Sequence, residues 1–187
     1  SAVVNHTEDL LIFVSRRPGN TGERDNHGSV FEYEDVYFSR RDANGWSKAE
    51  HLHGDVNSHA HEAPVWVSGD GTRLLLYYNK SKSKDPKKQG DIYESDFIDG
   101  KWTDPSPVKA VNSSWRETHA SMSNDGKTIF FTTNNPKWAK HGGMDIVKTT
   151  MDSDGNWSEP VDVGSKINTE WDEESPFIKP DGKHFYF

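Results

Sequence analysis

The feature that most constrains this chain is an internal repeat with a period close to 55 residues. Three segments align without gaps: NSHAHEAPVWVSGDGTRLLLYY, NSSWRETHASMSNDGKTIFFTT and NTEWDEESPFIKPDGKHFYF, which begin at Asn57, Asn112 and Asn168. Further markers keep the same period: Asp70, Asp125 and Asp181, each followed by Gly, then Asp35, Asp91 and Asp145, and finally Trp46, Trp102 and Trp157. Such self-similarity indicates stacked copies of one supersecondary unit.

Each unit is expected to contain four short strands. The Asp-Gly pair supplies the positive φ that a tight hairpin needs between the first and second strands. Aromatic and β-branched residues dominate the flanking segments, as they do in pleated, half-buried strands, and no long stretch has the helical period. Four strands per unit at this period predict an all-β fold of β-propeller blades made of antiparallel strands. A β-solenoid, whose repeat is normally much shorter, is the alternative.

The repeat also predicts the blade boundaries within a single propeller domain, 1–187. The units are approximately 1–61, 62–116 and 117–172, followed by a partial unit, 173–187. The first unit departs from the pattern because its opening turn is NHTED in place of Asp-Gly. Closed propellers typically have 4–8 blades, so we expect further blades outside this sequence. Pairing of the two ends in an unusually small ring is the alternative.

Composition narrows the classes of function. The net charge of −8 argues against a general nucleic-acid surface. Cysteine is absent, which excludes disulfides and thiolate metal sites, and no apolar run approaches the roughly 20 residues of a membrane helix. The hydrophobic fraction of 32% is low, but seven Trp, six Tyr and nine Phe supply the area for an aromatic core.

Several segments resemble a known repeat family. SPFIKPDGKHFYF, GGMDIVKT and GNWSEPVDVGSKINTEWDEESP are similar to the WD40-like propeller repeat of TolB-type proteins. The resemblance is strongest to the version found beside OmpA-type peptidoglycan-binding domains in bacterial envelope proteins. It implies a binding or scaffold module in the periplasm or at the outer membrane, with an envelope protein or glycan, including one associated with peptidoglycan, as its partner. It implies no cofactor, and no OmpA-type domain is recognised in the chain.

The crossovers between units are the first place where binding residues are expected. In the histidine-rich crossover HLHGDVNSHAHEAP, His61 matches Arg116 and Asp172 in the other copies. The following residue is glutamate in all three copies, at Glu62, Glu117 and Glu173. These positions begin the innermost strands, so they are expected to ring the mouth of the central channel. A recurring residue is usually structural, and we interpret the glutamates as acceptors of hydrogen bonds from neighbouring blades, with ligand binding as the alternative.

The histidines raise the question of a metal site. His59 and His61 share a strand face if the segment is extended, whereas Glu62 points to the other face. Zinc needs three or four ligands, and His51 and His53, one strand earlier, are the candidates to complete a set. The matched crossovers carry arginine and aspartate instead. We therefore predict no bound metal and interpret the histidines as solvated loop residues.

The loops between the second and third strands lie on the same face as the crossovers. NNPKWAKHGG carries Trp138 and His141, and Trp138 is interpreted as packing under its loop, with a ligand platform as the alternative. The lysine-rich NKSKSKDPKKQG is either a solubilising loop or a contact for an anionic partner. The candidate binding residues of this face are His59, His61, Glu62, Arg116, Glu117, Asp172, Glu173, Trp138 and His141. The tryptophans that recur at 46, 102 and 157 are expected to be buried at equivalent positions.

The function predicted from these features is a non-catalytic propeller that recognises or scaffolds an envelope protein or glycan. The repeat is strong, and no convergent set of catalytic residues is identified. The alternative is a glycan-active hydrolase or lyase whose site is the histidine-rich crossover. A protein-interaction propeller inside the cell is a third hypothesis.

Overall fold

A computed structural model describes residues 1–17, 20–21, 34–58, 61–79 and 84–187. The strands of the first half are β1 (Ala2–Val4), β2 (Leu10–Ser15), β3 (Asp35–Asp42), β4 (Gly45–Trp46), β5 (Glu50–His51), β6 (Glu62–Val67), β7 (Arg73–Tyr78), β8 (Asp91–Ile98), β9 (Lys101–Trp102) and β10 (Ser106–Pro107). Those of the second half are β11 (Glu117–Met122), β12 (Thr128–Thr133), β13 (Asp145–Thr150), β14 (Val161–Asp162), β15 (Phe177–Ile178) and β16 (Phe185–Tyr186). A short 3-10 helix, η1 (Pro86–Lys88), precedes β8. The described residues contain no helix with the length and apolar character to cross a membrane.

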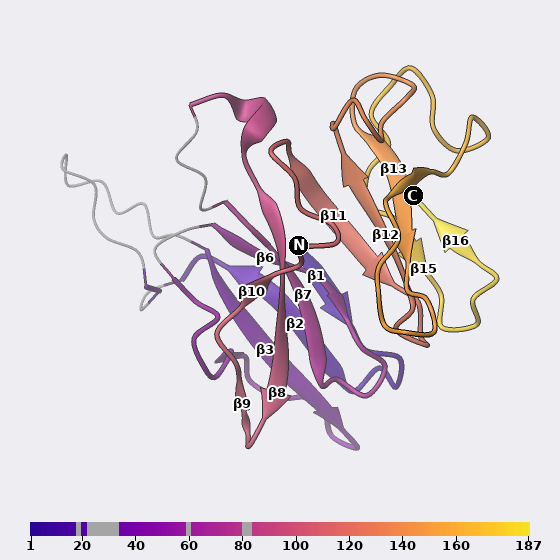
Figure 1. Ribbon diagram of the computed structural model, residues 1–187. Coiled ribbons are helices and arrows are strands. Elements are labelled where there is room, and N and C mark those ends of the chain that lie inside the picture. Colours follow the sequence, from indigo (N-terminus) through magenta and orange to yellow (C-terminus); the bar gives the residue numbers. More distant parts are fainter. Residues whose placement is uncertain (18–19, 22–33, 59–60, 80–83) are drawn as a thin grey trace. The chain divides into compact units, whose positions relative to one another are not determined.

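The strands form successive sheets that follow the repeat (Figure 1). The first has the order β1-β2-β3-β4, with β5 also paired to β3, and the second has the order β10-β8-β7-β6, with β9 paired to β8. The third has the order β11-β12-β13-β14, and β15 pairs with β16 in a last, two-stranded sheet. The predicted all-β fold of antiparallel sheets that follow the repeat is therefore confirmed, although the first two sheets contain five short strands each. The blade boundaries and the single-domain organisation remain predictions.

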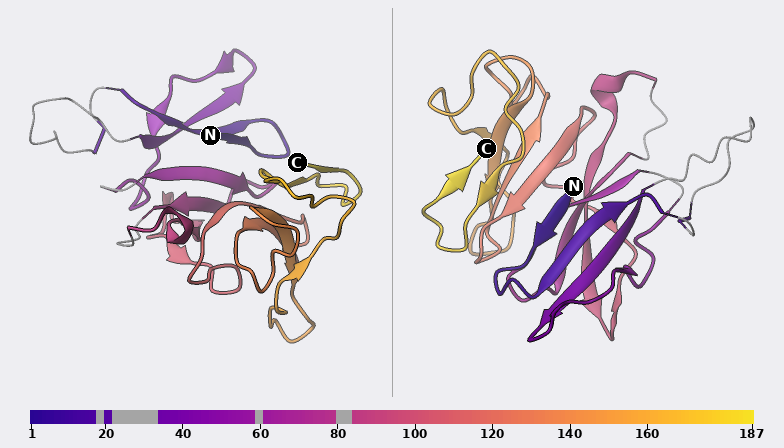
Figure 2. Two further views of the ribbon diagram at one scale, coloured as in Figure 1. Left: turned by 90° about the horizontal axis from the view of Figure 1, so that it is seen from above. Right: turned by 180° about the vertical axis from the view of Figure 1, so that it is seen from behind.

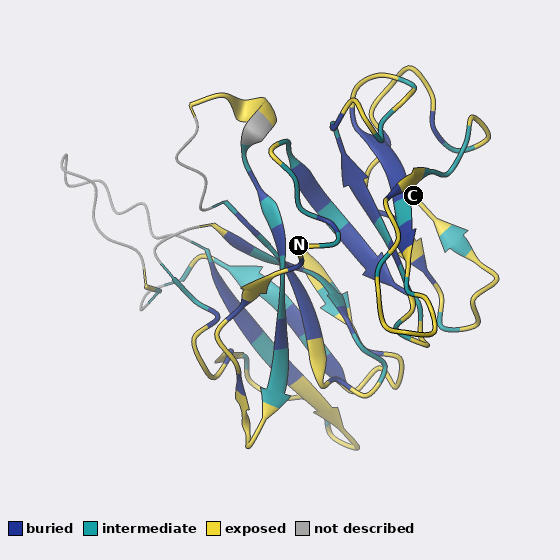
Figure 3. Ribbon diagram, viewed as in Figure 1, coloured by how far each residue is buried: buried dark blue, intermediate teal, exposed yellow. Residues whose placement is uncertain are grey.

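The chain falls into two compact units, which we describe separately. The first contains Ser1–Lys80 and Tyr93–Ser106, and the second contains Ser81–Ile92 and Pro107–Phe187. In the first unit, the sheet of β1 to β4 lies against β6 (Figure 2, indigo to magenta). The residues buried between these sheets include Leu10, Ile12, Leu74, Leu76 and Tyr78. In the second unit, burial is concentrated along β11, β12 and β13 (Figure 3), and β11 contacts β15.

The Asp-Gly hairpins form as expected. Gly71, Gly126 and Gly182 have φ values of 71°, 70° and 65°, the left-handed region that glycine occupies without steric cost. Each glycine N–H donates to the carbonyl three residues earlier, which closes the turn. The aspartate before each glycine accepts backbone N–H groups from the residues that follow the turn. The first hairpin uses Asn5 instead, whose side chain accepts from the N–H groups of Asp9 and Leu10.

The asparagine that opens each repeat segment has a structural role. Its side-chain amide pairs with one residue of the third strand as a neighbouring strand would. Asn112 accepts from the Ile92 N–H at 2.8 Å and donates to the Ile92 carbonyl at 2.7 Å. The three pairs are Asn57 with Val36, Asn112 with Ile92, and Asn168 with Ile146. The amide thereby satisfies backbone groups that burial would otherwise leave unpaired.

The recurring tryptophans are not equally buried, so that part of the prediction is wrong. Trp102 is 5% exposed, Trp157 is half-buried, and Trp46 is 45% exposed. Trp102 lies against the preceding crossover. Its backbone N–H donates to the His53 carbonyl at 3.0 Å, and its backbone forms an isolated β-bridge with Gly54. Trp46 has different surroundings. Among the described residues, its ring instead faces the Arg41 guanidinium, 6.0 Å from the ring centroid.

Candidate functional site

The recurring glutamates are buried and bound by their own crossovers. Glu117 accepts from the Ser113 hydroxyl at 2.8 Å, from the Ser113 N–H at 3.1 Å and from the Thr133 hydroxyl at 2.8 Å. Ser58 donates in the same way to Glu62, and Thr169 to Glu173. Burial raises the pKa of Glu117 to about 7 against the opposing effect of these donors. The donors to Glu117 thus come from the crossover before β11 and from β12.

The histidines of the first unit engage different carboxylates. His51 Nε2 lies 3.3 Å from Asp35 Oδ2, and the His51 ring packs on Tyr37. His53 Nε2 lies 3.9 Å from Glu50 and its ring meets the edge of Phe38. His61 is exposed, and its carbonyl accepts from the Asn79 N–H, whereas His59 lies outside the described residues. Across the part of the chain that the structure describes, no three His, Asp or Glu side chains are grouped to hold a metal ion.

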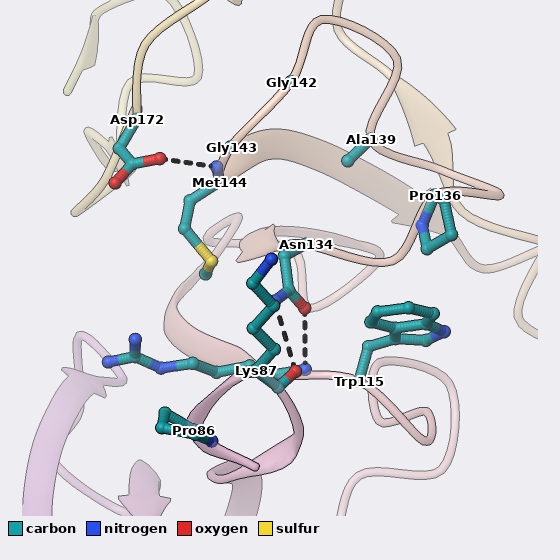
Figure 4. Close-up of a pocket in the computed structure, with 11 residues that line it drawn as sticks. Pro86, Lys87, Trp115, Asn134, Pro136, Ala139, Gly142, Gly143, Met144 and Asp172 are labelled. Carbon is teal, nitrogen blue, oxygen red and sulfur yellow. Dashed lines mark hydrogen bonds between the residues drawn. The ribbon is translucent and has the colours of Figure 1, made fainter.

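The second unit contains a pocket of about 420 Å³, which we call the loop pocket (Figure 4). It is formed by η1, by the crossover before β11, by the loop between β12 and β13, and by the next crossover. Its lining residues are Pro86, Lys87, Trp115, Arg116, Asn134, Pro136, Ala139, Gly142, Gly143, Met144 and Asp172. The loops that form it are the irregular ones that the sequence places at this end of the sheets.

The glycine pair at 142 and 143 allows two of these loops to approach each other. Gly142 and Gly143 have φ values of 107° and 66°. A Cβ atom on Gly143 would lie 2.2 Å from Asp172 Oδ1, so a side chain there would displace the Asp172 carboxylate. The same Asp172 oxygen accepts from the Met144 N–H at 2.8 Å (Figure 4). Glycine at this position therefore leaves room for the Asp172 carboxylate, which the Met144 N–H holds at the edge of the loop pocket.

The Asn134 side chain connects η1 to the crossover before β11. Its Oδ1 accepts from the Arg116 N–H at 2.9 Å, and its Nδ2 donates to the Lys87 carbonyl at 3.2 Å. These bonds hold the backbone of the cationic residues Lys87 and Arg116 at one wall. Trp115, which is half-buried, precedes Arg116 in the same crossover. The arrangement offers a ligand an indole ring, two cations, and the Asp172 oxygen that Met144 does not use.

Trp138 and His141 support the loop and do not line the loop pocket. The Trp138 ring stands at 87° to Phe131, with its centroid 6.1 Å away, and its indole N–H donates to Glu159 at 3.3 Å. The His141 N–H donates to the buried Asp145 carboxylate at 2.8 Å, and its Nε2 lies 3.5 Å from Asp162. For Trp138 these contacts agree with packing under the loop.

The loop pocket thus contains two of the candidate residues, Arg116 and Asp172, together with residues that sequence analysis did not select. Trp115 had a visible signal, because the same repeat position carries Trp171 in the next copy. Lys87 lay within the lysine-rich loop but had no feature to separate it from its neighbours. The glycine pair was visible in GGMDIVKT, yet nothing in the sequence said which side chain it approaches.

Comparison with known structures identifies the fold. The chain is similar to the crystal structure of TolB from Acinetobacter baumannii, with a TM-score of 0.56 and 14% sequence identity. The match covers 98% of this chain and 36% of the TolB chain. No protein-family model matches the sequence, and no curated protein sequence matches it. The chain therefore has a TolB-type, propeller-like fold and spans only part of the length of that neighbour. The predicted neighbourhood of an OmpA-type domain remains a prediction.

Proposed function

We propose that this chain is a non-catalytic recognition module of the bacterial envelope and that it binds its partner, an envelope protein or glycan, through the loop pocket. The observation that carries the proposal is the grouping of Trp115, Lys87, Arg116 and Asp172 around one cavity. Small-molecule and side-chain recognition typically uses such a concave site with an aromatic wall and a few polar groups. The likeness to TolB supports a place in the periplasm or at the outer membrane.

The positions and hydrogen bonds of the acidic residues favour recognition over catalysis. Hydrolysis of a glycosidic bond usually needs two carboxyl groups that face the same bond. In the loop pocket, Asp172 is the carboxylate of the lining, and one of its oxygens already accepts from Met144. Glu117 is buried and accepts from Ser113 and Thr133. In the histidine-rich crossover, two of the described histidines, His51 and His53, pair with separate carboxylates.

The experiment is co-sedimentation of the full chain with envelope fragments of a Gram-negative bacterium. We expect the wild-type protein to sediment with the fragments, and the double variant Trp115→Ala/Arg116→Gln to stay in solution. The matched control is Trp171→Ala, which removes a 74% exposed tryptophan at the equivalent repeat position. Equal sedimentation of the wild-type protein and the double variant would contradict the proposal, as would a loss confined to Trp171→Ala.

A further inference from the structure

We infer that the ligand of the loop pocket is an acidic sugar, with its ring on Trp115 and its carboxylate at Lys87 and Arg116. This inference rests on the proposed function and specifies the ligand class of that site. Three observations lead to it: the charge balance of the lining, the kind of surface that surrounds Trp115, and the hydrogen-bonding capacity left at Asp172.

The charge balance selects an anion with a single charge. The whole chain carries a net charge of −8, but the lining of the loop pocket holds two cations, Lys87 and Arg116, and one carboxylate, Asp172. The pocket is therefore locally positive within an acidic protein, which concentrates anions there. A carboxylate matches the single excess positive charge, and the planar Arg guanidinium binds carboxylates in a favourable geometry.

The lining of the loop pocket suits a ring-shaped ligand. Three of its residues, Ala139, Gly142 and Gly143, are small and lie across the opening from the indole (Figure 4). Figure 4 shows Trp115 below Pro136, with Lys87 beside it and Asp172 across the opening. The cavity of about 420 Å³ lies within the roughly 300–1,000 Å³ range of small-ligand sites. Trp115 presents a broad apolar face with a polar edge, which suits the mixed apolar and polar surface of a sugar ring.

Asp172 separates a sugar from an acidic peptide. Its Oδ1 accepts from the Met144 N–H, so its other oxygen remains as an acceptor at the rim. A sugar acid carries hydroxyl donors for this oxygen as well as a carboxylate for the cations. An acidic side chain carries acceptors alone, so an acidic peptide can offer this oxygen only its backbone N–H groups. The lining therefore complements a ligand that has donors and one negative charge on the same ring.

The test is calorimetric titration of the full chain with two acidic sugars, glucuronic acid and N-acetylmuramic acid, which represent the uronic and the lactyl sources of a sugar carboxylate. Their neutral counterparts are glucose and N-acetylglucosamine, and a glutamate-rich peptide represents the protein alternative. We expect at least one acidic sugar to bind about tenfold or more tightly than its neutral counterpart, because a hydrogen bond to a charged group is worth about that factor. The stronger of the two identifies the source, and added salt weakens the binding.

The variants locate the binding. Lys87→Ala and Arg116→Gln should each weaken the acidic sugar about tenfold and leave the neutral sugar unchanged, and Trp115→Ala should weaken both. Trp115→Phe, which keeps an aromatic ring, serves if the alanine variant does not fold. The controls are Lys127→Ala, an exposed cation at the opposite end of β11, and Trp171→Ala, neither of which should change the binding.

Two outcomes would overturn the inference. The first is equal binding of acidic and neutral sugars, or no binding of either. The second is preference for the glutamate-rich peptide. If envelope sedimentation still depends on Trp115 and Arg116 in either case, the proposed function stands and only the ligand class is wrong. If sedimentation is also independent of these residues, the proposed function fails with it.

Discussion

Replacement of Gly54 by alanine tests how closely one crossover packs on the next sheet. Gly54 lies in the first unit with φ of 111°, and its backbone bridges Trp102. A Cβ atom at this position would lie 2.1 Å from the Trp102 carbonyl oxygen and 2.9 Å from its carbonyl carbon. Gly45 is the matched control, because its φ is 109° and a Cβ atom there would meet nothing within 4 Å.

The expected cost follows from the two geometries. Positive φ costs an L-residue roughly 1–2 kcal/mol, and both variants carry this penalty. At Gly54 the Trp102 backbone must also move by more than about 1 Å, because non-bonded atoms rest near 3.5 Å. The move breaks the 3.0 Å bond from the Trp102 N–H to the His53 carbonyl, worth about 1 kcal/mol, and loosens the buried indole. We expect Gly54→Ala to be about 2–4 kcal/mol less stable than Gly45→Ala.

Urea unfolding measures this difference directly, with the free energy of unfolding of each variant compared with that of the wild-type protein. The far-ultraviolet circular dichroism of both folded variants should match the wild type, so that the comparison concerns stability alone. A difference between the two variants below about 0.5 kcal/mol, the usual scale of a neutral surface change, would refute the close approach of the Gly54 crossover to Trp102.

Further predictions concern the core and the buried polar groups. Trp102→Ala should lower the free energy of unfolding by about 3–5 kcal/mol and the exposed Trp46→Ala by less than about 1 kcal/mol; similar losses would contradict the burial difference. Because burial raises the pKa of Glu117 to about 7, the folded chain holds this proton more tightly than the unfolded chain, whose carboxyl has the ordinary pKa near 4.5. The protonated Glu117 contributes fully to the free energy of unfolding below pH 4.5. About 3 kcal/mol of that free energy is lost as the pH rises to about 7. Glu117→Gln should remove this pH dependence of the free energy of unfolding between pH 4.5 and pH 8. An unchanged pH dependence would disprove its assignment to Glu117. Asn112→Ala should cost about 1–3 kcal/mol and speed hydrogen exchange at the Ile92 amide, and unchanged exchange there would exclude the amide pairing.

The fold was predictable because the sequence repeats its own architecture. The Asp-Gly pairs mark hairpins whose left-handed position glycine occupies without steric cost, and the spacing of the other markers assigns the remaining strands. The repeat predicted the burial of Trp46 incorrectly for a physical reason. It identifies equivalent positions within a unit, but the burial of a side chain also depends on the segments that pack beside it. Trp102 has Gly54 and His53 of a preceding crossover beside it, and Trp46 has the Arg41 guanidinium.

The loop pocket was only partly predictable. Matching the crossovers selected Arg116 and Asp172, since both replace a histidine at the same repeat position. Lys87 joins them through a loop that has no counterpart of equal length in the other units, and no repeat alignment places it. The decisive contact is the approach of Gly143 to Asp172, which depends on the path of two loops far apart in the chain. Such convergence is a property of the tertiary structure and leaves no local pattern.

The measurement that tests the account most directly is the nuclear magnetic resonance spectrum of the seven tryptophan indole N–H groups during titration with the acidic sugar that binds more tightly. Single Trp→Phe variants assign the resonances. The account predicts a saturable shift of the Trp115 resonance, with those of Trp102 and Trp171 unchanged. A saturable shift at Trp171 with none at Trp115, or a spectrum that does not change at any ligand concentration, would contradict recognition of an acidic sugar through the loop pocket.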